Sequence, residues 1–137
     1  MLLTIDEAYS RITGADFTRA ALITDPHQPD NPIIYATKAF YELTGYDREE
    51  VIGRNCRFLQ GPNTDPQAIT DIREAVLDLS PITIDILNYC KDGRPFWNRL
   101  RIRPSFDADG ALEYFIGVQN PIAERDVRPF KLDRFVE

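Results

Sequence analysis

Residues 53–60 read Gly-Arg-Asn-Cys-Arg-Phe-Leu-Gln, and this octapeptide places a thiol between an amide and a guanidinium group. A cation stabilises the thiolate that makes cysteine reactive, so Arg57 is expected to favour the electron-rich states of the Cys56 sulfur. The alternative is that Cys56 is a small apolar filler, as most free cysteines are. Composition alone favours this second interpretation, so the decision depends on the rest of the chain.

Capping signals, apolar stripes and alternation predict the elements on both sides of the octapeptide. The expected helices lie at residues 4–14, 38–43, 48–51, 56–59 and 65–77. The expected strands lie at residues 21–24, 33–36, 83–90, 96–103 and 111–119. Two strands, a helical middle and three strands predict an α+β fold, with a five-stranded antiparallel sheet and helices packed on one face.

Alternation along the last three expected strands puts one carboxamide on the core face of each. These side chains are Asn88, Asn98 and Gln119. An unpaired buried amide costs about 1–3 kcal/mol, so the three side chains need partners. They either bond to one another and to backbone, as most buried amides do, or bind the polar edge of a flat ring. Gly117 beside them leaves room for such a ring.

Two arginines, Arg57 and Arg73, add a candidate anion site. Guanidinium groups suit phosphate, although Arg73 could instead form an exposed salt bridge with Asp71 or Glu74. With the amides, the arginines indicate a mononucleotide-like cofactor, and the thiol indicates that its ring is an electrophile.

The composition argues against several classes of function. The net charge of −6 and the pI of about 4.8 disfavour nucleic acid or an anionic membrane as a partner, because both require a basic surface. No apolar run reaches the length of a membrane span and no secretion signal is recognisable, so a cytoplasmic location is expected. The two cysteines should then be free thiols. One histidine and no Cys-x-x-Cys pair predict no metal site.

The chain resembles the LOV (light, oxygen, voltage) family of PAS domains. Beside the octapeptide, the resemblance rests on Ile-Thr-Asp-Pro at 23–26, Asp-Asn-Pro-Ile at 30–33, Gln-Gly-Pro at 60–62 and Tyr-Phe-Ile-Gly-Val-Gln at 114–119. It implies an N-terminal helical cap at 1–20, a flavin-binding core at 21–122 and a C-terminal extension at 123–137. Nothing in the chain resembles an effector domain, so a short LOV protein is expected.

The resemblance also implies a role for each candidate residue. Cys56 would form the covalent adduct, Gln119 would lie near flavin N5, and Asn88 and Asn98 would bind the pyrimidine edge. Asn55 and Gln60 would contact the flavin or its ribityl chain, while Arg57 and Arg73 would bind the phosphate. The pocket would also be lined by Thr24, Asn31, Leu100, Ile102 and Phe115. Cys90 departs from the family pattern and is expected to be an ordinary free thiol.

The implied cofactor is FMN, in preference to FAD or riboflavin, because residues 61–65 lack the insertion of family members that bind the dinucleotide. The implied function is a blue-light photoreceptor, not an enzyme. Illumination would join the Cys56 sulfur reversibly to flavin C4a, and a protonated N5 would reverse the hydrogen bonding of Gln119. Two alternatives remain: a flavin redox sensor or flavoenzyme, and a PAS interaction module without a cofactor.

An apolar patch is expected on the outer face of the sheet, opposite the amides. Its members are Leu87, Tyr89, Trp97, Leu112, Tyr114, Ile116 and Val118. A patch of this size is normally covered, here by the N-terminal helix, the C-terminal tail or a second copy of the chain. We therefore expect a homodimer through this face or the terminal helices, with a separate effector protein as the alternative partner.

Overall fold

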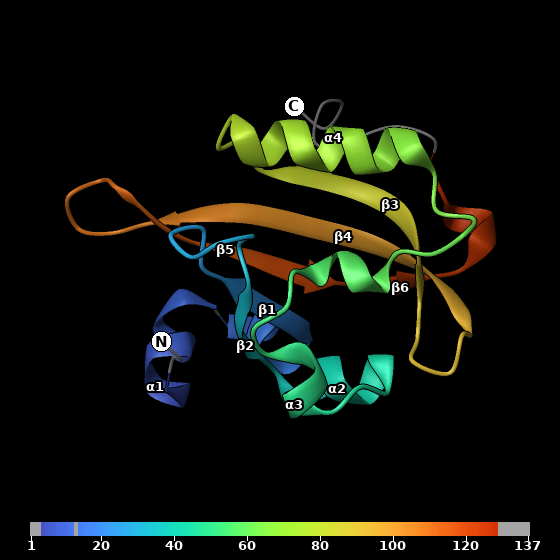
Figure 1. Ribbon diagram of the computed structural model, residues 1–137, viewed down its shortest axis with the longest axis horizontal. Coiled ribbons are helices and arrows are strands. Elements are labelled where there is room, and N and C mark those ends of the chain that lie inside the picture. The colour runs from blue at the N-terminus through green and yellow to red at the C-terminus, as the bar shows by residue number, and fades with distance from the viewer. Residues whose placement is uncertain (1–3, 13, 129–137) are drawn as a thin grey trace.

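The computed structural model describes residues 4–12 and 14–128 of the 137-residue chain (Figure 1). Its helices are α1 (Ile5–Arg11), η1 (Gly14–Thr18), α2 (Lys38–Thr44), α3 (Arg48–Val51), η2 (Cys56–Leu59), α4 (Pro66–Leu77) and η3 (Glu124–Asp126), where η marks a 3₁₀ helix. Its strands are β1 (Ala20–Thr24), β2 (Ile33–Ala36), β3 (Ile82–Tyr89), β4 (Pro95–Phe106), β5 (Leu112–Gln119) and β6 (Pro121–Ile122). The α+β class and the predicted order of elements are confirmed, with shifts of a few residues at element ends.

One antiparallel sheet holds the strands of the described residues in the order β2-β1-β5-β4-β3, and β6 pairs with the first part of β4. The prediction of five strands is therefore wrong by one short strand. β6 continues the line of β5 after a break at Asn120 and pairs Trp97 with Ile122. A two-residue strand has no alternation to detect, and proline is tolerated where a strand pairs on one side only.

Capping side chains fix the starts of the two helices that border the site. Asp65 accepts a hydrogen bond from a backbone N–H of the first turn of α4, and Pro66 occupies the tolerated first position. In the octapeptide, the Asn55 side chain accepts from the N–H of Arg57 at 3.0 Å and starts η2 at Cys56. The thiol therefore stands on the first residue of a short, capped helix.

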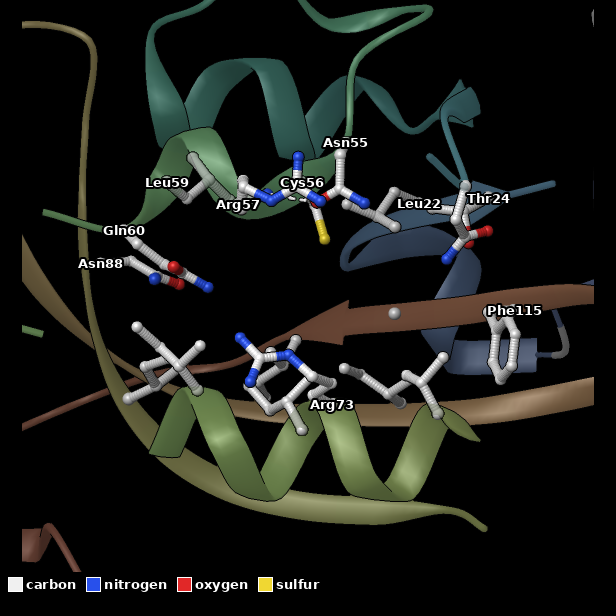
Figure 2. A pocket seen from close by; sticks show the side chains of 18 of the residues that line it. Leu22, Thr24, Asn55, Cys56, Arg57, Leu59, Gln60, Arg73, Asn88 and Phe115 are labelled. Carbon is white, nitrogen blue, oxygen red and sulfur yellow. Dashed lines mark hydrogen bonds between the residues drawn. The ribbon is translucent and has the colours of Figure 1, made fainter. Parts of the chain in front are cut away.

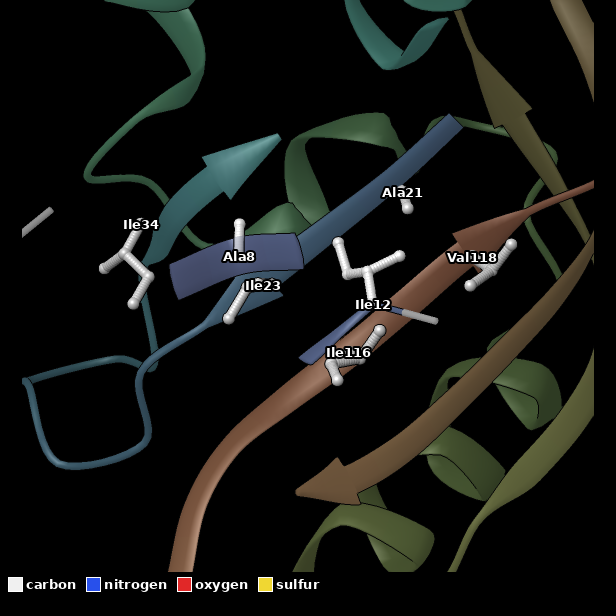
Figure 3. Close-up of a cluster of buried hydrophobic side chains, with 7 residues drawn as sticks. All are labelled: Ala8, Ile12, Ala21, Ile23, Ile34, Ile116 and Val118. Atoms are coloured by element: carbon white, nitrogen blue, oxygen red, sulfur yellow. The ribbon is translucent and has the colours of Figure 1, made fainter. Parts of the chain in front are cut away.

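The N-terminal helix covers one half of the outer sheet face. Ala8 and Ile12 of α1 are fully buried and pack with Ile23, Ile116 and Val118 of the sheet (Figure 3). The last two belong to the apolar patch that we expected to need a cover. On this half of the face, the chain itself supplies the cover.

Polar contacts hold α1 in place. Arg11 donates to both carboxylate oxygens of Glu113 on β5, at 3.0 and 2.9 Å. Arg103 of β4 donates to the carbonyl oxygen of Arg11 at 2.9 Å. The ion pair is half-buried and bidentate, which is the geometry in which an Arg–carboxylate pair contributes most.

The other half of the outer face, on β3 and β4, carries a buried charge that the sequence analysis missed. The side chain of Asp85 is 0% exposed and accepts from Arg99 at 2.8 and 3.0 Å. It also accepts from the backbone N–H of Arg128 at 2.7 Å, while Arg99 donates to the carbonyl oxygen of Asp126 at 2.9 Å. The segment after β6 is thus bound to this half of the sheet.

The remaining members of the predicted patch are half-buried, and Tyr89 among them has specific partners within the chain. The Tyr89 ring lies against Gly61, where any added Cβ would clash with it. The Tyr89 hydroxyl also accepts from the N–H of Asn63 at 3.0 Å. Tyr89 is therefore occupied by the segment between η2 and α4.

Candidate functional site

A cavity of about 370 Å³ lies between α4, η2 and the sheet (Figure 2). Small-molecule sites in proteins have volumes of about 300–1,000 Å³, so this cavity is large enough for a ligand. It is lined by every residue that the sequence analysis assigned to the site except Asn98: Thr24, Asn31, Asn55, Cys56, Arg57, Gln60, Arg73, Asn88, Leu100, Ile102, Phe115 and Gln119.

The lining residues that the sequence analysis did not assign to the site are apolar. They are Leu22, Leu59, Ile69, Ile72, Val76, Leu77 and Ile86, and Gly117, which was expected beside the amides, also lines the cavity. The lining residues of α4 recur at the spacing of one helix face. The lining residues of the strands lie two positions from residues that were assigned, and so share their face of the sheet. The same periodicities that located the amides could therefore have found them.

The three amides form a hydrogen-bonded chain. Asn98 is fully buried behind the wall and donates from Nδ2 to Asn88 Oδ1 and to Gln119 Oε1, both at 2.9 Å. Its own Oδ1 accepts from the N–H of Asn120 at 2.9 Å. The interpretation that the amides pair with one another is thus correct, but the pairing is incomplete, because it leaves Gln119 Nε2 without an acceptor.

Among the side chains of the described residues, three buried polar atoms have no hydrogen-bond partner, and all three lie on residues of the cavity wall. They are Thr24 Oγ1, Asn31 Oδ1 and Gln119 Nε2. Leaving such a group unpaired costs about 1–3 kcal/mol, which a ligand with matching donors and acceptors would offset. On the same wall, a Cβ added to Gly117 would approach Leu22 to 3.3 Å and Gln119 Nε2 to 3.7 Å, so the glycine leaves space there. The wall therefore fits a flat polar ring.

The sulfur of Cys56 points into this cavity from η2 (Figure 2). Burial raises the pKa of the Cys56 thiol, and the nearby positive charge of Arg57 opposes the shift only in part. The charge of Arg57 does favour the electron-rich sulfur, as we expected, but burial has the larger effect and leaves the pKa raised. Arg57 also binds the carboxylate of Asp30, at 2.6 and 2.7 Å, and the negative charge of Asp30 adds a smaller upward contribution to the pKa of Cys56.

A titration can test this protonation state. Because the pKa lies above its ordinary value of 9.0, Cys56 should remain a neutral thiol up to that pH. Burial of the neutral form contributes stability below the ordinary pKa, and this contribution is lost as the pH rises further. The measurement is the thiolate ultraviolet absorbance of the wild type minus that of Cys56→Ser, with Cys90→Ser as the control. A Cys56 midpoint below the ordinary value would contradict the assignment.

The two arginines differ in their surroundings. Arg73 extends from α4 into the cavity (Figure 2), and no ion pair joins it to a carboxylate among residues 4–12 and 14–128. The alternative salt bridge of Arg73 with Asp71 or Glu74 is not among the ion pairs of these residues. Arg57, in contrast, is paired with Asp30.

Cys90 does not line the cavity. It is a buried free thiol whose sulfur donates to the carbonyl oxygen of Leu43 at 3.4 Å and accepts from Arg94 at 3.2 Å. In the described part of the chain, no cluster of His, Cys, Asp and Glu could hold a metal ion. The same residues contain no helix that is long and apolar enough to cross a membrane.

Known proteins are similar to this chain in both fold and sequence. The sequence profile of the PAS domain matches residues 19–124. The dark structure of the blue-light photoreceptor Aureochrome1 LOV has a TM-score of 0.77 and 42% identity, covering 79% of this chain and 78% of that chain. This chain belongs to the LOV domains of the PAS family. The resemblance seen in the sequence is thereby confirmed.

Two further relatives are informative about this LOV domain. A structure solved to show how a flavin analogue sheds light on the LOV domain mechanism has a TM-score of 0.76 and 47% identity, covering 78% of this chain and 79% of that chain. Blue-light-activated histidine kinase 1 of Erythrobacter litoralis (strain HTCC2594) is 51% identical over 123 residues, which are 89% of this chain. The part of the kinase that this chain matches is only 34% of the length of the kinase.

Proposed function

We propose that this LOV domain is a blue-light sensor that binds a flavin, specifically FMN, in the cavity between α4, η2 and the sheet. The observation that carries the proposal is the set of three unpaired polar atoms, all on the wall that also presents the Cys56 thiol. The blue-light-activated kinase and the flavin-analogue structure among its relatives support the same assignment.

The wall offers a distinct surface to each part of such a cofactor. The amide chain of Asn88, Asn98 and Gln119 would bind the polar edge of the ring, with the free Nε2 of Gln119 as a donor. Apolar side chains would enclose its faces, including Leu100, Ile102 and Phe115. Thr24, Asn31, Asn55 and Gln60 would contact the ring or the ribityl chain, and Arg57 and Arg73 would bind the phosphate.

A bound flavin would supply light absorption and an electrophilic ring carbon. Cys56 would supply the sulfur that bonds reversibly to that carbon, and the capped start of η2 would keep the sulfur directed into the cavity. Because the thiol is neutral, it also brings a proton into the buried site. The Gln119 side chain can rotate its amide to accept instead of donate when the ring nitrogen beside it gains a proton.

As a light sensor, this domain would pass its signal to another molecule. The half-buried part of the outer face, with Leu87 and Trp97, is the surface that we propose for a second copy or a separate effector protein. The cytoplasmic location stays a prediction. Residues 129–137 of the expected C-terminal extension lie outside the described residues.

One spectroscopic experiment tests the function. The purified chain, incubated with FMN and freed of excess, should be yellow, should lose its blue absorption band on blue illumination and should regain it in the dark. Failure to bind any flavin would favour an interaction module without a cofactor. A bound flavin that oxidises NAD(P)H but shows no reversible bleaching would favour a flavoenzyme.

A further inference from the structure

The pairing of Arg57 with Asp30 makes the two proposed phosphate ligands unequal. Nη1 and Nη2 of Arg57 each donate to a different oxygen of Asp30, so both carboxylate oxygens are engaged. The hydrogen bonds from Arg57 lower the pKa of Asp30 and keep it ionised at neutral pH. A full negative charge therefore accompanies the positive charge of Arg57.

The backbone around Asp30 holds this carboxylate in position. Asp30 and Asn31 both adopt left-handed backbone conformations, with φ of 66° and 48°. Such conformations cost about 1–2 kcal/mol for most residues, and Asp and Asn tolerate them best. The Asn55 side chain donates to the carbonyl oxygen of Asp30 at 2.8 Å, which ties the loop to the octapeptide.

A second cavity of about 370 Å³ lies on the other side of the ion pair. Asn55 and Arg57 line both cavities, whereas Asp30 lines only the second. The guanidinium group of Arg57 is therefore paired with a carboxylate that belongs to the second cavity, although Arg57 also borders the first. Arg73 points into the first cavity without a carboxylate partner among residues 4–12 and 14–128.

We propose that Asp30 sets the selectivity of this site for an anionic over an uncharged cofactor tail. By neutralising Arg57, Asp30 reduces the preference for FMN over riboflavin, and Arg73 provides the larger part of the preference that remains. This inference rests on the proposed function, since it concerns the tail of the same flavin. It also gives the two arginines beside the proposed phosphate different roles. Arg57 is paired with a carboxylate, whereas Arg73 has no such ion pair among the described residues.

The test compares the dissociation constants of FMN and riboflavin for the chain freed of flavin. Asp30→Asn is the informative variant, because Asn also tolerates the left-handed conformation and keeps the backbone carbonyl that accepts from Asn55. We expect it to raise the preference for FMN roughly threefold to tenfold, as removal of one charge near a partly solvated anion does. Riboflavin affinity should be unchanged, which also shows that the cavity is intact.

Four further variants isolate the cause. Arg73→Gln should lower the preference for FMN more than Arg57→Gln does, and Asp30→Asn should have no effect in the Arg57→Gln background. Asp109→Asn, in the exposed turn between β4 and β5, removes the same charge far along the chain and should change neither constant. Added salt should reduce the Asp30→Asn effect, because the ion pair is exposed.

Two outcomes would overturn the inference. An unchanged or lowered preference for FMN in Asp30→Asn would show that Asp30 positions Arg57 for the phosphate instead of competing with it. If the wild type still binds FMN and bleaches reversibly, only this inference is lost. If the wild type binds neither flavin, the proposed function and this inference are lost together.

Discussion

Cys56→Ala is expected to retain the flavin and to lose the reversible light-driven bleaching completely. The substitution removes the only thiol on the cavity wall of the described residues and leaves the amide chain and Arg73 unchanged. A half-buried cysteine contributes little packing, so the loss of stability should be about 1 kcal/mol or less. The bound flavin should also remain fluorescent under illumination, because no bond to sulfur depletes it. Absorption and emission spectra during blue illumination are the measurement.

Cys90→Ala is the matched control for this prediction. Cys90 is buried between Leu43 and Arg94 and is not part of the cavity, so the variant should bleach and recover like the wild type. A Cys56→Ala protein that still bleaches reversibly would remove Cys56 from the mechanism. Loss of bleaching in Cys90→Ala would show that the two thiols are coupled.

Gln119→Leu should separate the photochemistry from its structural response. Gln119 lies on the cavity face of β5, while Ile116 and Val118 of the same strand pack against α1. Leucine cannot exchange a donor for an acceptor at the ring, so the variant should still bleach but should not transmit the change to α1. The measurement is amide hydrogen exchange of residues 4–12 in the dark and in the light. The wild type should show a light-dependent change that the variant lacks.

The fold should tolerate this substitution. Asn98 Nδ2 loses Gln119 Oε1 but keeps Asn88 Oδ1 as an acceptor, so the cost should be about 1 kcal/mol. The dark absorption band should shift slightly, because a hydrogen bond to the ring is lost. Equal light-dependent exchange in the two proteins would show that the signal does not pass through Gln119. Ile12→Ala, which weakens the packing of α1 alone, separates a looser helix from a missing signal.

Periodicity explains why so much of the wall could be predicted from the sequence. The face of a strand residue follows from its parity, so Asn88, Asn98 and Gln119 could be placed on one wall without knowing the register. The register itself pairs Ile86 with Asn98 and sets Asn88 diagonally across, and no property of the separate strands predicts this. The amide chain was therefore foreseeable as a group but not as a set of particular hydrogen bonds.

The protonation of Cys56 could not be predicted for a different reason. Burial is the main cause of its raised pKa and depends on the tertiary fold; Asp30, which pairs with Arg57 and adds to the shift, precedes Arg57 by 27 positions. The Asp85–Arg99 pair was missed in the same way, because it joins strands whose register was unknown. Charge pairing between distant segments depends on the tertiary fold, whereas parity and helical spacing are local.

The binding of the last described residues to Asp85 and Arg99 has a consequence for protein engineering. The chain reaches residue 128 with a backbone N–H bonded to β3 and, two residues earlier, a backbone carbonyl bonded to β4. A module joined directly after this point would inherit the orientation of those strands, because the junction has little freedom to rotate. A long Gly/Ser spacer at the junction would instead behave as a random coil and uncouple the module from the sheet. The choice of spacer therefore determines whether the attached module keeps a fixed orientation relative to the sheet or moves independently of it.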